Sequence, residues 1–207
     1  MTGETIYRVA FLLLFLLLLA MRIYFMIRVR RSGGRILPDD KAIEREGGRG
    51  YFIVRVIIFV ALIAFLVMYF AGAKWIEAFL FHLPAWRRWV GFAIGIITVC
   101  FWTWVQVTLD TQWSPQLQLI KEHHLITSGP YARIRHPLYA GMCGWFVSLT
   151  LLTTNWIFVG ACTLTFAGLL YRIPKEEQMM LEAFGDEYKE YMNRTGRLFP
   201  KFGMKGS

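Results

Sequence analysis

Charged residues and cysteines are scarce in this sequence, and both scarcities limit what the protein can be. Charged residues account for 18% of the 207 positions, whereas soluble domains carry about 25%. The three cysteines, Cys100, Cys143 and Cys162, lie inside apolar stretches without the spacing of a zinc site or a redox pair. We therefore disfavour a soluble globular domain and expect buried, inert thiols.

The sequence has no internal repeats or low-complexity tracts, and we expect no cleavable leader in it. Its N-terminal apolar run is too long for the apolar region of a secretory signal, and no A-x-A-like cleavage site follows it. We therefore expect this run to remain in the mature protein as a membrane span.

Long apolar runs dominate instead, since 56% of the residues are hydrophobic. Crossing a bilayer as a helix takes about 20 predominantly apolar residues, and the runs 6–27, 52–73 and 89–109 are long enough. The third run carries Trp102, Trp104 and Trp113 towards its far end, where indole rings suit the headgroup level.

A fourth apolar region, 139–171, is interrupted by Thr153, Thr154 and Asn155, which favour a turn. Each half would form about 22 Å of helix, which is short for a hydrocarbon core of about 30 Å. We expect a tight hairpin whose helices extend beyond the core at their inner ends. The predicted fold is thus an all-α integral membrane protein with five transmembrane helices.

The chain after the hairpin predicts a C-terminal amphipathic helix over residues 174–193. Pro174 suits the first turn of a helix, and Gly196 follows as a stop signal. Apolar side chains recur there at helical spacing, namely Leu181, Phe184, Tyr188 and Tyr191.

The distribution of basic residues predicts the orientation in the membrane. Lysine and arginine are concentrated in residues 28–49 and after the hairpin, whereas the connection between the second and third spans has only Lys74, Arg87 and Arg88. The positive-inside rule therefore places the N-terminus outside and the segments 28–49, 110–138 and 172–207 in the cytosol. We interpret the net charge of +9 as contact with anionic lipids rather than nucleic acid.

Polar residues in or near membrane segments mark either a functional site or a satisfied structural pair. In the stretch 129–141, Pro137 pushes His136 into an extended conformation and fits as the first residue of the fourth helix. The free N–H groups of that turn could bind a carboxylate, and Gly141 permits a close approach. The alternative is an interfacial His and Arg pair that meets headgroups, with Tyr139 in the aromatic belt.

Two further stretches carry polar side chains. Arg172 and Glu176 are neighbours if the helix continues through Pro174, which is equally compatible with a plain ion pair. In the stretch 116–126, Glu122 precedes two histidines. Adjacent histidines rarely face one ligand position, so we predict no metal.

A longer pattern joins these stretches and covers about residues 116–202. It reads Leu125-x-x-x-Gly129-x-Tyr131-x-x-x-Arg135-His136-Pro137-x-Tyr139-x-Gly141, then the hairpin, then Arg172-x-x-x-Glu176-Glu177 and Phe184-Gly185-x-x-Tyr188-x-x-Tyr191. The pattern resembles the isoprenylcysteine carboxyl methyltransferase family, to which the phospholipid N-methyltransferases look related.

The resemblance implies a membrane methyltransferase that uses S-adenosylmethionine at the cytosolic end of the hairpin. Residues 111–207 would be the catalytic core, and residues 1–110 would supply three spans and a basic cytosolic loop. Arg172 would face the acceptor's carboxylate, with Glu177 as a second catalytic candidate. The cofactor pocket would be lined by Gln116, His123, Leu125, Ile126, Tyr131, His136, Pro137, Leu138, Tyr139 and Glu176.

The acceptor favoured by the residues is a carboxylate, as in an isoprenylcysteine-like substrate that enters from the bilayer. A carboxylate is ionised at neutral pH and needs no base, only a cation such as Arg172 to hold it. An amine acceptor, as in a phospholipid, would need Glu176 or Glu177 as a base. An NADPH-dependent membrane reductase and a non-catalytic lipid-binding scaffold are further alternatives.

Overall fold

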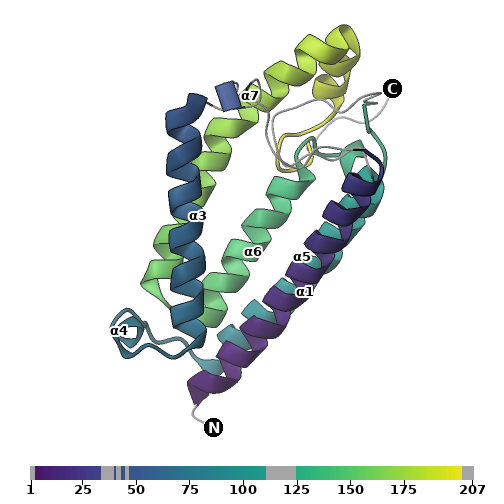
Figure 1. Cartoon of the computed structure of the whole chain (residues 1–207). Helices are drawn as coiled ribbons and strands as arrows, with labels where there is room; N and C mark the ends of the chain where they lie inside the picture. The colour runs from purple at the N-terminus through teal and green to yellow at the C-terminus, as the bar shows by residue number, and fades with distance from the viewer. Residues whose placement is uncertain (1–2, 34–39, 41–42, 45–46, 111–124, 202–207) are drawn as a thin grey trace.

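The computed structural model describes residues 3–33, 40, 43–44, 47–110 and 125–201. All regular elements in these ranges are helices (Figure 1), which confirms the predicted all-α class there. Four helices are long and apolar enough to cross a membrane: α1 (Gly3–Arg31), α3 (Gly48–Phe70), α5 (Ala85–Leu109) and α7 (Trp156–Arg194).

The fourth predicted span is the short helix α6 (Pro137–Thr153), which has 17 residues. Its length is about 25 Å, so it falls short of a complete hydrocarbon core of about 30 Å. By length and composition the described residues therefore contain four candidate spans rather than five. The remaining helices are the four-residue α4 (Lys74–Glu77) and the 3₁₀ turn η1 (Gly129–Ala132).

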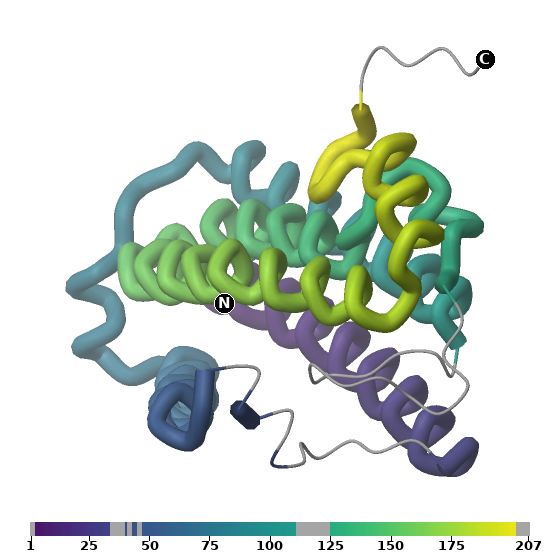
Figure 2. Tube along the Cα trace, turned by 90° about the horizontal axis from the view of Figure 1, so that it is seen from above, coloured from purple at the N-terminus to yellow at the C-terminus, as the bar shows by residue number. Residues whose placement is uncertain are grey.

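Helices α5 and α6 form the closest pair in the bundle, and α1 packs against both of them (Figures 1 and 2). Glycines allow this approach because a Cβ atom added to Gly91 would lie 2.6 Å from Leu151 Cβ, and one added to Gly144 would lie 2.6 Å from Thr98 Oγ1. Small residues are the usual device for close packing between membrane helices.

An aromatic cluster holds the peripheral helix α3 to the rest of the bundle. Phe158 on α7 packs edge-on against Phe65 and Tyr69 of α3 at ring-centroid distances of 5.0 and 5.1 Å. Phe11 of α1 meets Tyr69 from another side at 5.9 Å. Most of α3 is otherwise exposed, as suits a helix surrounded by lipid.

The predicted turn between α6 and α7 is confirmed. Thr154 adopts the left-handed conformation with φ 44° and ends α6. Asn155 begins α7, because its Oδ1 accepts from the Ile157 N–H at 2.9 Å while its Nδ2 donates to the Ile76 carbonyl at 3.0 Å. One buried asparagine therefore caps the helix and ties the turn to α4.

Residues 174–193 are helical, as predicted, but the prediction that a separate helix begins at Pro174 is wrong. Helix α7 continues through Pro174 to Arg194, and its backbone departs from helical geometry at Gly185 instead, with φ 53° and ψ −122°. Proline removes one backbone hydrogen bond without ending this helix, whereas the Gly185 conformation is one that glycine adopts without strain. The last residues of α7 thereby turn back towards the start of α6 (Figure 1).

The two ends of the bundle carry different polar groups. The C-terminal end of α1, η1, the start of α6 and the end of α7 lie together, opposite the N-terminus (Figure 1). At the N-terminal end, buried Arg88 of α5 pairs with Glu4 of α1 and donates to the Leu152 carbonyl at 2.7 Å. Arg88 therefore joins three helices at the end away from the predicted site.

Candidate functional site

The site begins where two segments that are distant in sequence pair through backbone hydrogen bonds beside α6. The Gly196 N–H donates to the Arg133 carbonyl at 3.1 Å, and the Arg135 N–H donates to the Gly196 carbonyl at 2.8 Å. The His136 N–H continues the ladder to the Arg197 carbonyl at 3.0 Å. The chain after α7 is thus fixed against the residues that lead into α6.

Glu177 of α7 is the centre of the charge network at this junction. It is 3% exposed, and its Oε1 accepts from Arg135 Nε at 2.8 Å while its Oε2 accepts from Arg197 Nη2 at 2.7 Å. His136 Nε2 lies 3.4 Å from Oε1. A buried carboxylate requires such partners, and these pairs raise the pKa of the Arg197 guanidinium.

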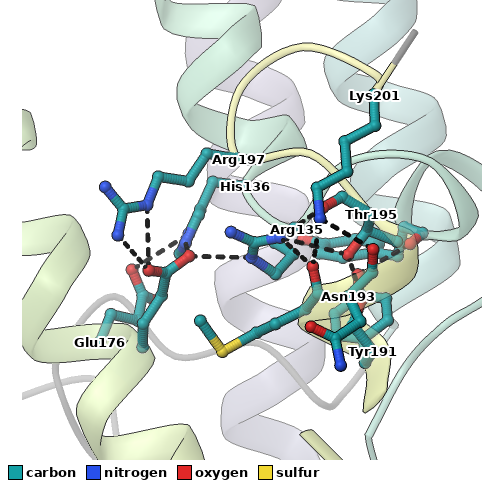
Figure 3. Close-up of polar contacts among 11 residues, drawn as sticks. Arg135, His136, Glu176, Tyr191, Asn193, Thr195, Arg197 and Lys201 are labelled. Atoms are coloured by element: carbon teal, nitrogen blue, oxygen red, sulfur yellow. Dashed lines mark hydrogen bonds and ion pairs between the residues drawn. The ribbon is translucent and has the colours of Figure 1, made fainter. Parts of the chain in front are cut away.

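Arg135 also holds the end of α7. Its Nη1 donates to the carbonyls of Met192 and Thr195 at 3.1 and 2.5 Å, while Lys201 Nζ donates to the Met192 and Asn193 carbonyls at 3.0 and 2.8 Å (Figure 3). Cationic side chains commonly satisfy the last carbonyls of a helix in this way.

A second polar group lies one residue away from this network and is more accessible. The Tyr139 hydroxyl donates to Glu176 Oε2 at 2.7 Å, and the His136 and Tyr139 rings stack with centroids 5.4 Å apart. The Glu176 side chain is 30% exposed and lies 3.7 Å from His136 Nδ1. Arg172 is close to the same Tyr139 hydroxyl, because helix α7 continues through Pro174.

An apolar wall adjoins this polar group on the side of α1 and α5. Ile126, Tyr131 and Leu138 pack against a buried cluster formed by Val29, Val105 and Leu109. Tyr131 is half-buried. The pKa of its hydroxyl is raised well above the ordinary value, mainly by burial and then by the negative charge of Glu176. Tyr131 therefore faces both the apolar wall and the carboxylate.

The structure brings most of the sequence-predicted site residues to this one place. His136, Tyr139 and Glu176 form the accessible polar group together with Arg172. Pro137 begins α6, as predicted, and Leu125 is half-buried at the start of its segment. Gln116 and His123, like Glu122 and Trp113, lie outside the described residues.

Two expectations about the start of α6 change. The Tyr139 and Ala140 N–H groups donate to the His136 carbonyl at 3.1 and 3.0 Å, so the first turn has fewer groups left for a carboxylate than the sequence suggested. Trp102 is buried rather than at the headgroup level, and its Nε1 donates to the Leu138 carbonyl at 2.8 Å. A Cβ atom on Gly141 would contact this indole, which confirms the close approach predicted there.

Several functional neighbours are absent from the sequence prediction. Arg197 follows the predicted helix stop, and only the reversal at Gly185 brings it to Glu177. Gln106 is buried on the face of α5 that also carries Trp102. Its polarity in an apolar run was the signal that could have identified it.

Chemically, the arrangement combines an apolar wall with a stacked imidazole and phenol and a partly exposed carboxylate. The two glutamates differ in their surroundings, because Glu177 is buried and accepts from the guanidinium groups of Arg135 and Arg197, whereas the Glu176 side chain is 30% exposed and accepts from the Tyr139 hydroxyl. Glu177 therefore has little basicity, and its contacts favour a role in positioning Arg135 and His136. Its predicted catalytic role stays a prediction.

Comparisons with known proteins find a family model and several methyltransferases to which part of this chain is similar. Residues 89–182 match the model of the Isoprenylcysteine carboxyl methyltransferase (ICMT) family. The chain is 32% identical over 124 residues to a protein-S-isoprenylcysteine O-methyltransferase of Dictyostelium discoideum. The aligned region covers 56% of this chain and 52% of that protein. It is also 29% identical over 122 residues to methanethiol S-methyltransferase 1 of Bradyrhizobium diazoefficiens. This second aligned region covers 52% of this chain and 42% of that protein.

A solved structure of the eukaryotic intramembrane Ras methyltransferase ICMT is also similar, at 25% sequence identity and a TM-score of 0.49. The match covers 77% of this chain and 55% of that chain. The match to the Dictyostelium discoideum protein spans about half of that protein's length, 52%.

Proposed function

We propose that this chain belongs to the isoprenylcysteine carboxyl methyltransferase family, whose model matches residues 89–182, and that it transfers a methyl group from S-adenosylmethionine to a lipophilic acceptor. The observation that carries the proposal is the meeting of His136, Tyr139 and Glu176 beside an apolar wall. These residues come from segments about 40 positions apart, and the turn at Gly185 and the backbone ladder hold them together.

The donor set fits the cofactor. S-adenosylmethionine would supply a sulfonium methyl group to the site. The Glu176 carboxylate suits the ammonium of its amino-acid part, and the wall of Ile126, Tyr131 and Leu138 suits an aromatic base. The remaining task of the protein is alignment of the reacting atoms and exclusion of water.

Arg172 supports a carboxylate acceptor over an amine. It lies next to Tyr139 and one helical turn before Glu176, where a guanidinium could hold a carboxylate with two hydrogen bonds. Among the two glutamates, Glu177 is unsuited to deprotonating an amine because two guanidinium groups already stabilise its charged form. We therefore favour an isoprenylcysteine-like acceptor, with a phospholipid or other lipid amine as the alternative.

A small thiol is a second candidate acceptor. It is favoured by the similarity to methanethiol S-methyltransferase 1, which is of the same order as the similarity to the isoprenylcysteine methyltransferase. A thiolate needs no guanidinium partner, so the two candidates predict different effects of an Arg172 substitution.

We also propose the topology that this reaction requires. Helix α6 would complete a fifth crossing together with the residues that precede it, and the end of the bundle that holds the site would face the cytosol. Basic residues near this end, including Arg28, Arg30 and Arg31 in the last turn of α1, support this orientation and contact with anionic lipids.

The test is labelled-methyl transfer by the purified protein to a farnesylcysteine, a phosphatidylethanolamine and methanethiol, each offered separately. Methylation of the farnesylcysteine that falls at least tenfold in Arg172→Ala, with unchanged S-adenosylhomocysteine affinity, is the expected result. Calorimetry should also show weaker S-adenosylhomocysteine binding by His136→Ala and Glu176→Ala but not by Glu182→Ala, an exposed residue of the same helix. Unchanged affinity in the first two variants would refute the pocket.

A further inference from the structure

Gln106 is a buried amide whose hydrogen-bonding groups are not satisfied within the described part of the protein. It is 1% exposed, and neither its Nε2 nor its Oε1 has a hydrogen-bond partner there. Buried side-chain amides are nearly always bonded, and polar residues at membrane depth are retained mainly where they serve a function. The backbone of Gln106 is ordinary helix, so the orphaned groups belong to the side chain alone.

The position of Gln106 places it against the proposed cofactor pocket. It lies one turn after Trp102, whose indole donates to the Leu138 carbonyl, and it shares the buried face of α5 with Val105 and Leu109. Those two neighbours pack against Ile126, Tyr131 and Leu138, the apolar wall of the site. Helical side chains lean towards the N-terminus of their helix, so the Gln106 amide extends towards the level of Leu138.

The chemistry of the amide selects the part of a ligand that it could meet. It is neutral and presents a donor beside an acceptor, a combination that pairs with the edge of an adenine ring through two hydrogen bonds. The ammonium of the ligand would have a charged partner elsewhere, at Glu176. The neutral edge of the adenine ring, placed against the apolar wall, is the part of the ligand that Gln106 could bind.

We infer that Gln106 is a specificity-determining residue that binds the adenine edge of the cofactor. The inference rests on the proposed function, since it requires an adenosine-containing ligand. In the ligand-free protein the amide destabilises the fold, and ligand binding supplies its missing partners. The same side chain should therefore have opposite effects on stability and on binding.

The test compares Gln106→Leu with the unaltered protein in two measurements. Without ligand, Gln106→Leu should melt at the same temperature or higher, because leucine fills the site without unsatisfied polar groups. By calorimetry, the unaltered protein should bind S-adenosylhomocysteine about tenfold more tightly than the analogue with purine in place of adenine. Gln106→Leu should bind both ligands equally, about tenfold more weakly than the unaltered protein binds S-adenosylhomocysteine.

Gln178→Leu is the matched control, because Gln178 is exposed on α7 and should change neither measurement. A lower melting temperature of ligand-free Gln106→Leu would overturn the inference, since it would mean that the amide is bonded in the fold. Retained preference for adenine over purine in this variant would also overturn it, as would a defect confined to the KM of the methyl acceptor. Failure of the unaltered protein to bind S-adenosylhomocysteine would reject the proposed function itself, and this inference with it.

Should Gln106→Leu fail to fold, Gln106→Glu keeps the shape and the acceptor atom but loses the donor. This variant should bind S-adenosylhomocysteine and the purine analogue more weakly, because it loses the donor to a ring nitrogen that both ligands share. It should still prefer S-adenosylhomocysteine, because it keeps the acceptor for the exocyclic amine. Unchanged affinity for both ligands would overturn the inference.

Discussion

Glu177→Gln isolates the charge of the carboxylate that joins α7 to the segments on either side of the site. In the folded protein Glu177 accepts from Arg135 at 2.8 Å and from Arg197 at 2.7 and 3.0 Å. Glutamine keeps the shape but removes the charge, and its NH₂ group would face donors of Arg197 or Arg135. The guanidinium groups would then lack their counter-ion.

The expected magnitude depends on how buried each partner is. Arg197 is 54% exposed, so water replaces most of its lost interaction, which leaves less than about 1 kcal/mol. Arg135 is 8% exposed, and breaking a buried pair costs about 3–5 kcal/mol. We take the lower end, about 3 kcal/mol, because Arg135 retains the Met192 and Thr195 carbonyls.

The measurement is thermal unfolding in detergent, without ligand. At about 2–4 °C per kcal/mol for a protein of this size, Glu177→Gln should melt about 6–12 °C below the unaltered protein. Glu182→Gln is the control, since Glu182 is exposed on the same helix and should shift the melting temperature little. A melting temperature of Glu177→Gln within about 1 °C of the unaltered protein would refute the positioning role and revive a purely catalytic one.

Two more substitutions test the packing between α5 and α6 at Gly141 and the contacts of Arg88 at the N-terminal end of the bundle. Gly141→Ala should destabilise the protein by about 1–3 kcal/mol, because its Cβ would lie 2.6 Å from Trp102 Cδ1. Gly160, like Gly141, is the fifth residue of its helix, but a Cβ atom added there would meet open space. Gly160→Ala should therefore be neutral or stabilising in the same melting experiment. Equal effects of the two substitutions would contradict the close packing of Gly141 against Trp102. Arg88→Met should lower the melting temperature by several degrees, because buried Arg88 joins Glu4 to the Leu152 carbonyl. Neighbouring Arg87→Met is the exposed control, and a comparable loss there would contradict the assigned role of Arg88.

Local signals in the sequence were sufficient for most of the fold. Run length identified α1, α3 and α5, and the Thr154 and Asn155 turn was predictable because both residue types favour reversals. The course of α7 was not predictable in the same way. Pro174 is a strong local signal for a helix start, yet packing of α7 keeps it inside the helix, and a glycine 11 residues later makes the turn.

The site was predictable where its residues are close in sequence or belong to the quoted pattern. His136, Tyr139 and Glu176 were found for that reason. Arg197 was missed because its contact with Glu177 depends on the direction of the chain after Gly185. Trp102 was misplaced because an indole near the end of an apolar run fits a headgroup and a helix interface equally well, and only the pairing of α5 with α6 decides between them.

The backbone ladder between residues 133–136 and 196–197 also sets an order of events during synthesis. The residues that lead into α6 emerge from the ribosome well before their partners, which follow the entire hairpin. The Arg135 and His136 N–H groups have no access to the Gly196 and Arg197 carbonyls until both helices of the hairpin have been synthesised. Synthesis of the whole hairpin therefore precedes formation of the ladder, and a nascent chain that ends between α7 and Gly196 lacks the backbone contacts that fix residues 133–136.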